Sequence, residues 1–320
     1  DSQTKETLTL RASSFGSKCD LPASFLKAVA DAGVADRVLS FASFKQDRQL
    51  KKTDGAKRVR ITGLPKLMDA NDAGGKHSAD CTLILTEGDS AKSLVVGGLS
   101  VSGRDKFGVF PLRGKLLNVR EASAAQVAAN AEIQNIKQIL GLQHGRAYDS
   151  ARSLRYGHLM IMTDQDHDGS HIKGLIMNFF HTFYPSLLKV PGFLQEFITP
   201  IVKATKGKQE VAFYTLPEYE AWRAGRGGPG GVAGGWRVKY YKGLGTSTEK
   251  EAKAYFAAIA QHRKDFVWEG PSDGAALELA FSKKKVEERK EWLAGCEDGL
   301  FLDQTAATIS YADFVHRELI

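Results

Sequence analysis

The spacing of apolar residues divides the chain into three parts. Between residues 21 and 50, Phe25, Val29, Val38 and Phe41 recur every few positions, a pattern that predicts helix. A basic segment follows at 51–60, and then TGLPKLMDANDAGG, whose proline, asparagine and glycine content predicts an irregular connection. We therefore expect a boundary near residue 76.

Short apolar runs alternate with helical sequence in the second part. CTLILT at 81–86, FGVFPL at 107–112 and GHLMIMT at 157–163 predict buried strands. Helices are predicted at 90–99, at about 122–142, and after the third strand through residue 188. This alternation predicts an α/β fold with a mostly parallel sheet that is flanked by helices.

The third part, after about residue 200, has a less regular α+β pattern. FITPIVKAT, QEVAFYTL and WRVKYYKGL predict further strands, and helices rich in Lys and Glu are predicted at 248–262 and 274–294. Between them, GRGGPGGVAGG at 225–235 is typical of a flexible surface insertion rather than of a phosphate-binding loop.

Composition restricts the class of protein. A chain of 320 residues with 42% hydrophobic content fills one large domain or two ordinary ones. The chain has neither a long apolar run nor a signal peptide, so no membrane partner is expected. Cys19, Cys81 and Cys296 are widely spaced, which favours a reducing compartment over a disulfide framework or a zinc site.

Charge and the two ends of the chain add two expectations. The net charge of +7 suits a polyanionic partner, but it is also common among ordinary soluble proteins. The chain begins without Met, and its last residues, YADFVHRELI, end on an apolar pair rather than on a solvated tail. These ends predict a piece of a longer polypeptide.

Three aspartates directly follow the third predicted strand. Asp164, Asp166 and Asp168 repel one another unless a cation neutralises them, which favours a divalent metal. An EF-hand fits less well, because its twelfth position is Leu175 and a strand stands where a helix is required. A solvated acidic turn remains the alternative for such a run taken alone.

Glu87 ends the first predicted strand and can reach the same edge of the sheet as Asp164, since loops leave a parallel sheet at the carboxyl ends of its strands. Taken singly, Glu87 equally fits a carboxylate at a helix start, and Asp89 and Ser90 are expected as N-cap groups. Oxygen ligands favour Mg²⁺, and we interpret His167 as a loop residue rather than a ligand.

Four motifs together carry a family resemblance. EGDSA at 87–91, PLRGK at 111–115, IMTDQDHDGSHIKGL at 161–175 and YYKGLGTSTEKEAK at 240–253 resemble the TOPRIM domain of type IIA DNA topoisomerases, in the eukaryotic form. The resemblance covers nearly the whole chain. An EGD or a DxDxD alone also suits bacterial primases, which the linked set of four excludes.

The resemblance implies a domain arrangement. Residues 1–76 are expected to form the end of the transducer domain and a linker, 77–200 a Rossmann-like TOPRIM core, 201–308 a TOPRIM extension, and 309–320 the start of a winged-helix domain. Arg155-Tyr156 imitates the Arg-Tyr pair of the family's nucleophile, but it lies within TOPRIM sequence. We therefore interpret Tyr156 as structural.

The same resemblance assigns the site. Glu87 with Asp164 is expected to hold one Mg²⁺, and Asp164 with Asp166 a second, with Asp168 in support. Arg113, Lys115 and Lys242 are expected to contact DNA phosphates, the first two as part of the catalytic site. Gln3 and Lys5 resemble the QTK loop that reaches the γ-phosphate of ATP.

The predicted function is that of the cleavage and religation module of an ATP-dependent, nuclear, homodimeric enzyme that passes one DNA duplex through another. A winged-helix domain would supply the attacking tyrosine in trans, so this chain alone is expected to be inactive. The alternatives are a stand-alone TOPRIM nuclease or primase, and a noncatalytic DNA- or calcium-binding module.

Overall fold

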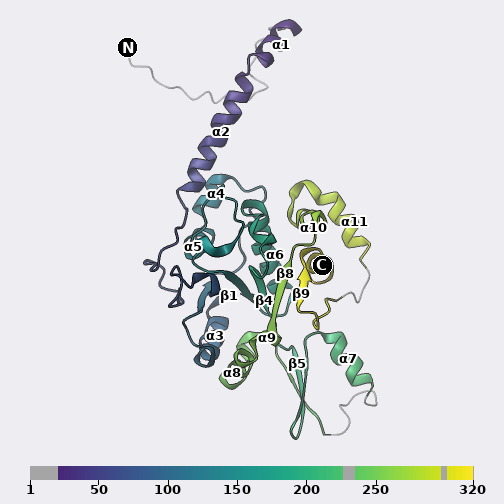
Figure 1. Ribbon diagram of the computed structural model, residues 1–320. Coiled ribbons are helices and arrows are strands. Elements are labelled where there is room, and N and C mark those ends of the chain that lie inside the picture. The colour runs from purple at the N-terminus through teal and green to yellow at the C-terminus, as the bar shows by residue number, and fades with distance from the viewer. Residues whose placement is uncertain (1–20, 226–234, 297–300, 320) are drawn as a thin grey trace. The chain divides into compact units, whose positions relative to one another are not determined.

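A six-stranded sheet forms where the apolar runs predicted strands. The computed structural model describes residues 21–225, 235–296 and 301–319, so the predictions for Gln3, Lys5 and most of the glycine-rich insertion lie outside the described residues. The chain divides into two compact units, residues 1–46 and 47–320. The sheet lies in the second unit (Figure 1).

The helical pattern before residue 50 forms two helices, α1 (Ala23–Asp31) and α2 (Val34–Lys51). They are separated at Gly33, whose φ of +68° is a conformation that glycine adopts without steric cost. The apolar side chains that predicted these helices, such as Phe25, Val38 and Phe41, are exposed.

The sheet has the strand order β2-β1-β3-β4-β8-β9. Neighbours are parallel except for the antiparallel pair of β4 and β8, which confirms the predicted mostly parallel sheet. Its strands are β1 (Thr82–Glu87), β2 (Phe107–Leu112), β3 (His158–Met162), β4 (Leu194–Phe197), β8 (Arg263–Val267) and β9 (Thr308–Ser310).

Helices cover both faces of this sheet, because successive strand residues are apolar on alternate sides. Leu83 and Leu85 join one buried cluster, and Ile84 between them joins the other. The first cluster includes α5 (Ala131–Leu140), α6 (His167–Phe183) and α10 (Pro271–Phe281). The second includes α3 (Gly88–Ser102) and α8 (Glu249–Ala257).

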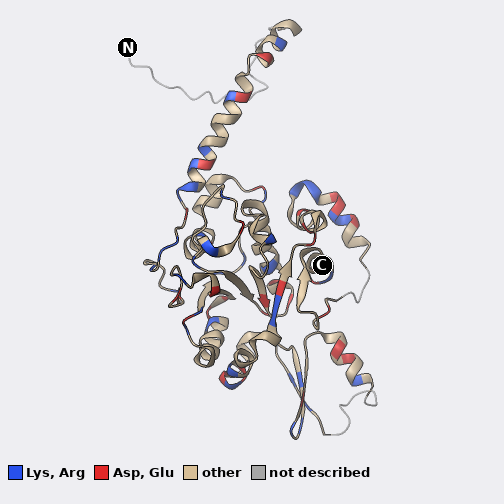
Figure 2. Cartoon of the chain, viewed as in Figure 1, with Lys and Arg blue, Asp and Glu red and all other residues tan. Residues whose placement is uncertain are grey.

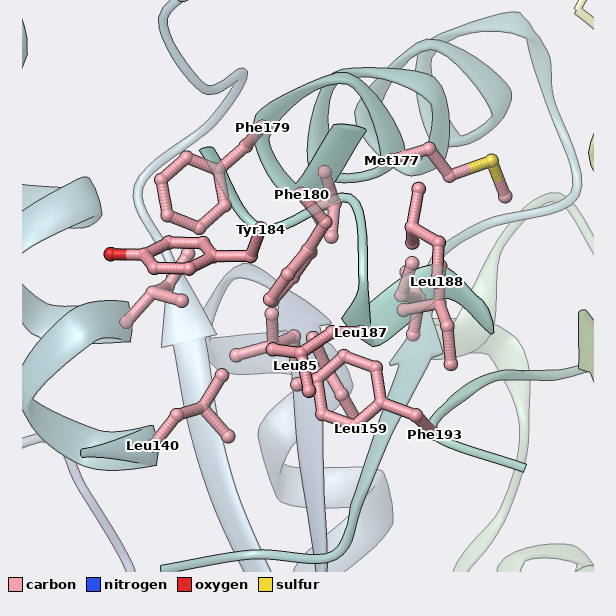
Figure 3. Packing of buried hydrophobic residues seen from close by; sticks show 14 of the residues in the cluster. Leu85, Leu140, Leu159, Met177, Phe179, Phe180, Tyr184, Leu187, Leu188 and Phe193 are labelled. Carbon is pink, nitrogen blue, oxygen red and sulfur yellow. The ribbon is translucent and has the colours of Figure 1, made fainter. Parts of the chain in front are cut away.

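Aromatic side chains at the end of α6 and just after it fill the space between this helix and the sheet. Figure 3 shows Phe179, Phe180 and Tyr184 above Leu85 and Leu159 of the central strands. The rings of Phe179 and Phe180 meet edge to face with centroids 5.1 Å apart, an arrangement that aromatic pairs favour. This packing sets the distance between α6 and the sheet. It therefore also positions the aspartates that precede α6.

A smaller antiparallel sheet follows, with the order β6-β5-β7. Its strands are β5 (Val202–Lys206), β6 (Gln209–Phe213) and β7 (Arg237–Tyr240), and α7 (Leu216–Ala224) follows β6. The predicted run FITPIVKAT is thus split between β4, which ends at Phe197, and β5, which begins at Val202.

The remaining helices are shorter than their patterns predicted. The 122–142 pattern forms α4 (Ala124–Ala129) and α5, because the Asn130 side chain caps the second helix by accepting from Ile133 N. The other helices are α9 (Ile259–His262), α11 (Val286–Ala294) and α12 (Tyr311–Arg317). Figure 2 shows charges of both signs along α11, as expected for an exposed helix.

No helix among the described residues is both long enough and apolar enough to cross a membrane.

Candidate metal and nucleic-acid site

Three adjacent strands end at one edge of the sheet, and each delivers a motif residue there. β1 ends at Glu87, which is in register with Leu112 of β2, and Thr86 is in register with Met162 of β3. Arg113 directly follows β2, and Asp164 comes two residues after β3. The predicted convergence of Glu87 and Asp164 at one carboxyl edge is therefore present.

Glu87 and Asp164 touch each other. The Asp164 N–H donates to Glu87 Oε2 over 3.4 Å, a long hydrogen bond. Burial raises the pKa of Glu87, the Asp164 N–H opposes this, and the negative charges of Asp164 and Asp166 raise it again. The carboxylate is thus half-buried among like charges, an environment that a cation would relieve.

The side chain of Asp164 is held by a segment far along the chain. Leu244 N donates to Asp164 Oδ1 over 2.7 Å, so the YYKGLG motif meets the aspartate motif. A Cβ built on Gly243 would lie 2.2 Å from Asp164 Oδ2, which means that only glycine lets the backbone approach this closely. Asp164 is therefore braced on two sides by residues 243 and 244.

The other two aspartates are engaged differently. Asp166 is the N-cap of α6, and its Oδ1 accepts from Gly169 N over 2.9 Å. Asp168 pairs with Lys115 at 2.7 Å, and this lysine lowers the pKa of Asp168. Asp168 is thus neutralised by a motif lysine in this structure.

The four predicted ligands do not form a closed cage. Across residues 21–225, 235–296 and 301–319, no group of three or more His, Cys, Asp or Glu side chains is close enough to hold a metal ion. The donor set nevertheless fits Mg²⁺, because Glu87 and Asp164 present carboxylate oxygens at one edge and this ion keeps several of its waters.

The prediction that Asp89 and Ser90 cap α3 is wrong. The N-cap position is Glu87, which makes no side-chain cap hydrogen bond. Asp89 lies in the first turn and pairs with Lys66 at 2.6 Å, since the irregular segment before β1 passes beside this turn. Lys92 reaches the same segment by donating to the Lys66 carbonyl over 2.8 Å.

The three predicted DNA contacts, Arg113, Lys115 and Lys242, are all exposed. The backbone N–H of Arg113 donates to the Glu132 carboxylate. Burial raises the pKa of Glu132, and this hydrogen bond opposes the rise. These three cations follow β2 or adjoin residues that contact the aspartates, and their side chains are open to solvent.

Comparisons with known proteins agree with the motifs. Residues 82–197 match the Toprim domain, and residues 197–320 match the C-terminal associated domain of TOPRIM. DNA topoisomerase 2 of Arabidopsis thaliana is 62% identical over 322 residues, and that of Pisum sativum 60% over 321; each comparison covers 100% of this chain and 22% of the relative. DNA topoisomerase 2-beta of Homo sapiens is 57% identical over 336 residues, covering 100% of this chain and 20% of the relative.

A solved structure also superposes on the chain. The crystal structure of the Plasmodium falciparum topoisomerase II DNA-binding, cleavage and re-ligation domain matches with a TM-score of 0.78 and 57% identity, covering 82% of this chain and 35% of that one. The chain belongs to the eukaryotic DNA topoisomerase 2 family. It spans about a fifth of the length of the curated relatives named above.

Tyr156 is a core residue in this member of the topoisomerase 2 family, as the sequence predicted. Its side chain is fully buried, and its hydroxyl donates to Asp69 and accepts from Ala70 N at 3.0 Å. Burial raises the pKa of Tyr156 far above its usual range. A phenol in this environment is neither accessible nor readily ionised.

Sequence reasoning missed two contributors to the site. Leu244 acts through its backbone N–H, and a backbone donor leaves no trace in residue identity. Lys66 lies in the irregular TGLPKLMDANDAGG connection, where no periodicity signals its contact with Asp89.

Proposed function

We propose that this chain supplies the Mg²⁺-dependent cleavage and religation part of an ATP-dependent type IIA topoisomerase, which passes one DNA duplex through a transient break in another. The observation that supports this most directly is the meeting of Glu87 and Asp164 at one sheet edge, with Arg113 beside them. A carboxylate pair next to exposed cations suits a phosphodiester, whose negative charge needs stabilisation on both sides of the break.

The carboxylates at this edge would hold the metal. Glu87 with Asp164 would hold one Mg²⁺ and Asp164 with Asp166 a second, while Asp168 supports the set. When bound, the metal supplies positive charge to the scissile phosphate and to the departing oxygen.

Arg113, Lys115 and Lys242 would hold the DNA backbone next to the carboxylates. Lys115 pairs with Asp168 in this structure, and a phosphate is an alternative partner of the same charge. We infer that this lysine exchanges the aspartate for DNA, because both groups are exposed and such a pair adds little stability by itself.

We propose the partners that the family resemblance implies. Double-stranded DNA is the substrate, and the active form is a nuclear homodimer in which a winged-helix domain supplies its tyrosine in trans. Gln3 and Lys5 would reach the γ-phosphate of ATP bound to a preceding domain. The chain alone would therefore bind Mg²⁺ and DNA without relaxing supercoils.

Metal binding tests the assignment in the isolated chain. We expect titration calorimetry to detect Mg²⁺ binding that Glu87→Gln and Asp164→Asn each abolish, with little change in thermal stability. Asp80→Asn is the matched control, since Asp80 is an exposed aspartate that pairs with Lys106 just before β1 begins. Binding that survives both site variants would contradict the proposal.

A chimera tests the reaction. The equivalent segment of the Arabidopsis thaliana enzyme, which is 62% identical, can be replaced by this chain. We expect the chimera to relax supercoiled DNA with ATP, and Glu87→Gln to stop cleavage while DNA binding persists. Cutting or primer synthesis by the isolated chain would instead indicate a stand-alone TOPRIM nuclease or primase.

A further inference from the structure

Glu251, in the first turn of α8, gathers hydrogen-bond donors from two sides. Its carboxylate accepts from Thr248 N at 2.7 Å and Thr248 Oγ1 at 2.9 Å on the helix side. On the strand side it accepts from Lys239 Nζ at 3.0 Å and from the Tyr241 hydroxyl. One carboxylate therefore ties the end of β7 to the start of α8.

The surrounding donors favour the ionised form of Glu251. Burial by itself would raise the pKa of Glu251, but the Thr248 N–H, the Tyr241 hydroxyl and the Lys239 ammonium lower it to about 2. Lys239 also lies 4.3 Å from the centroid of the Tyr241 ring, which reinforces the same cluster. At neutral pH this carboxylate is therefore ionised and can accept from all of these donors.

The segment between these two anchors is the one that touches Asp164. Tyr241 N donates to the Ile201 carbonyl over 2.8 Å, and Leu244 is buried in the cluster of α3 and α8. Leu244 N donates to Asp164 Oδ1, and Gly243 lies so close that a Cβ would reach Asp164 Oδ2.

We infer that Glu251 is a positioning residue for Asp164, because it braces both ends of the 241–248 segment and so fixes the Leu244 N–H and the Gly243 backbone against that carboxylate. Partners of a metal ligand set its orientation and its affinity for the ion. The inference rests on the proposed function, in which Asp164 holds Mg²⁺.

A neighbouring glutamate provides the comparison within the same helix. Glu249 pairs with Lys253, four residues further along α8, and is exposed. Among the residues that the structure describes, its carboxylate makes no hydrogen bond to the 241–248 segment, whereas that of Glu251 accepts from Tyr241. Glu249→Gln therefore removes one charge from α8 and leaves the brace intact.

The test measures Mg²⁺ affinity and the exchange of the Leu244 amide in the whole 320-residue chain. We expect Glu251→Ala to weaken Mg²⁺ binding about 10- to 100-fold, the usual effect of losing a ligand's partner. Hydrogen exchange at Leu244 should become faster in the same variant. Glu249→Gln should change neither quantity.

Tyr241→Phe tests the same contact without removing the Glu251 carboxylate that caps α8. It removes one bond to Glu251 while the Thr248 capping box remains, so α8 keeps its start. We expect a smaller loss of Mg²⁺ affinity and faster exchange at Leu244. Glu251→Gln, which retains an acceptor for Thr248 N, should recover part of the affinity lost in Glu251→Ala.

Two kinds of failure are distinguishable. If wild-type binding of Mg²⁺ does not depend on Glu87, the proposed function fails, while the exchange of the Leu244 amide still reports on the brace. If binding depends on Glu87 but Glu251→Ala and Tyr241→Phe leave either affinity or exchange unchanged, the positioning role of Glu251 is overturned.

Discussion

Replacing Lys173 with Met tests the buried charge cluster beneath the aspartate motif. Lys173 lies on α6, and its Nζ is 2.8 Å from Glu196 Oε2 and in contact with Glu318. The side chains of Lys173 and Glu196 are only 2% and 1% exposed. Methionine fills a similar volume, so the substitution removes the charge and leaves the buried Glu196 and the half-buried Glu318 without this cation.

The size of the effect follows from that burial. Removing one partner of a buried ion pair costs about 3–5 kcal/mol, because the remaining charge is neither paired nor solvated. For a folded unit of this size we expect the melting temperature to fall by about 6–20 °C. The surface pair of Lys253 and Glu249 supplies the control, since Lys253→Met should leave the melting temperature nearly unchanged.

The loss should depend on pH with a definite sign. Burial raises the pKa of Glu196, and the charge of Lys173 opposes that rise. Without Lys173 the folded-state pKa rises further above its unfolded value, so stability is lost as pH rises through that pKa. The gap between wild type and Lys173→Met should therefore be larger at about pH 8 than at about pH 5.

Thermal and urea melts of both proteins at the two pH values measure this gap. A variant as stable as wild type at the higher pH would refute the reasoning from burial. A gap that is large but equal at both pH values would show that the cost comes from packing rather than from unpaired carboxylates.

Two further predictions concern the core and the cysteines. Gly98→Ala places a Cβ 2.1 Å from the buried Phe256 ring and should destabilise the protein by about 1–3 kcal/mol in urea melts, whereas Gly97→Ala, next door on α3, meets only a flexible side chain and should be neutral or stabilising. Burial raises the pKa of Cys81 to about 11, so we expect mass mapping after alkylation at neutral pH to find Cys296 modified and Cys81 protected until the protein is denatured.

The sequence predicted the parts of the site that depend on strand direction. Apolar runs at 81–86 and 157–163 gave β1 and β3, and parallel pairing then required Glu87 and Asp164 to meet at one edge. Residue identity and periodicity suffice for this step, because the carboxyl ends of parallel strands always share an edge.

Contacts between distant segments were not predictable in this way. Leu244 lies 80 residues after Asp164, and the bond between them depends on how α8 packs against α3. The sequence predicted Asp89 as a helix cap. In the structure its carboxylate pairs with Lys66 instead, because the irregular segment before β1 passes beside the start of α3. Pattern reasoning has no access to where such a segment runs.

The structure also separates the aspartates by how firmly each is held. Asp164 is fixed by a backbone donor from another part of the fold and by a glycine that leaves it no room. Among the described residues, Asp166 is bonded only within its own helix start, and Asp168 pairs with an exposed lysine. Because orientation at a metal site comes from the groups around each ligand, Asp164 is the preorganised member of the set, and Asp166 and Asp168 are the members that can adjust when charge arrives.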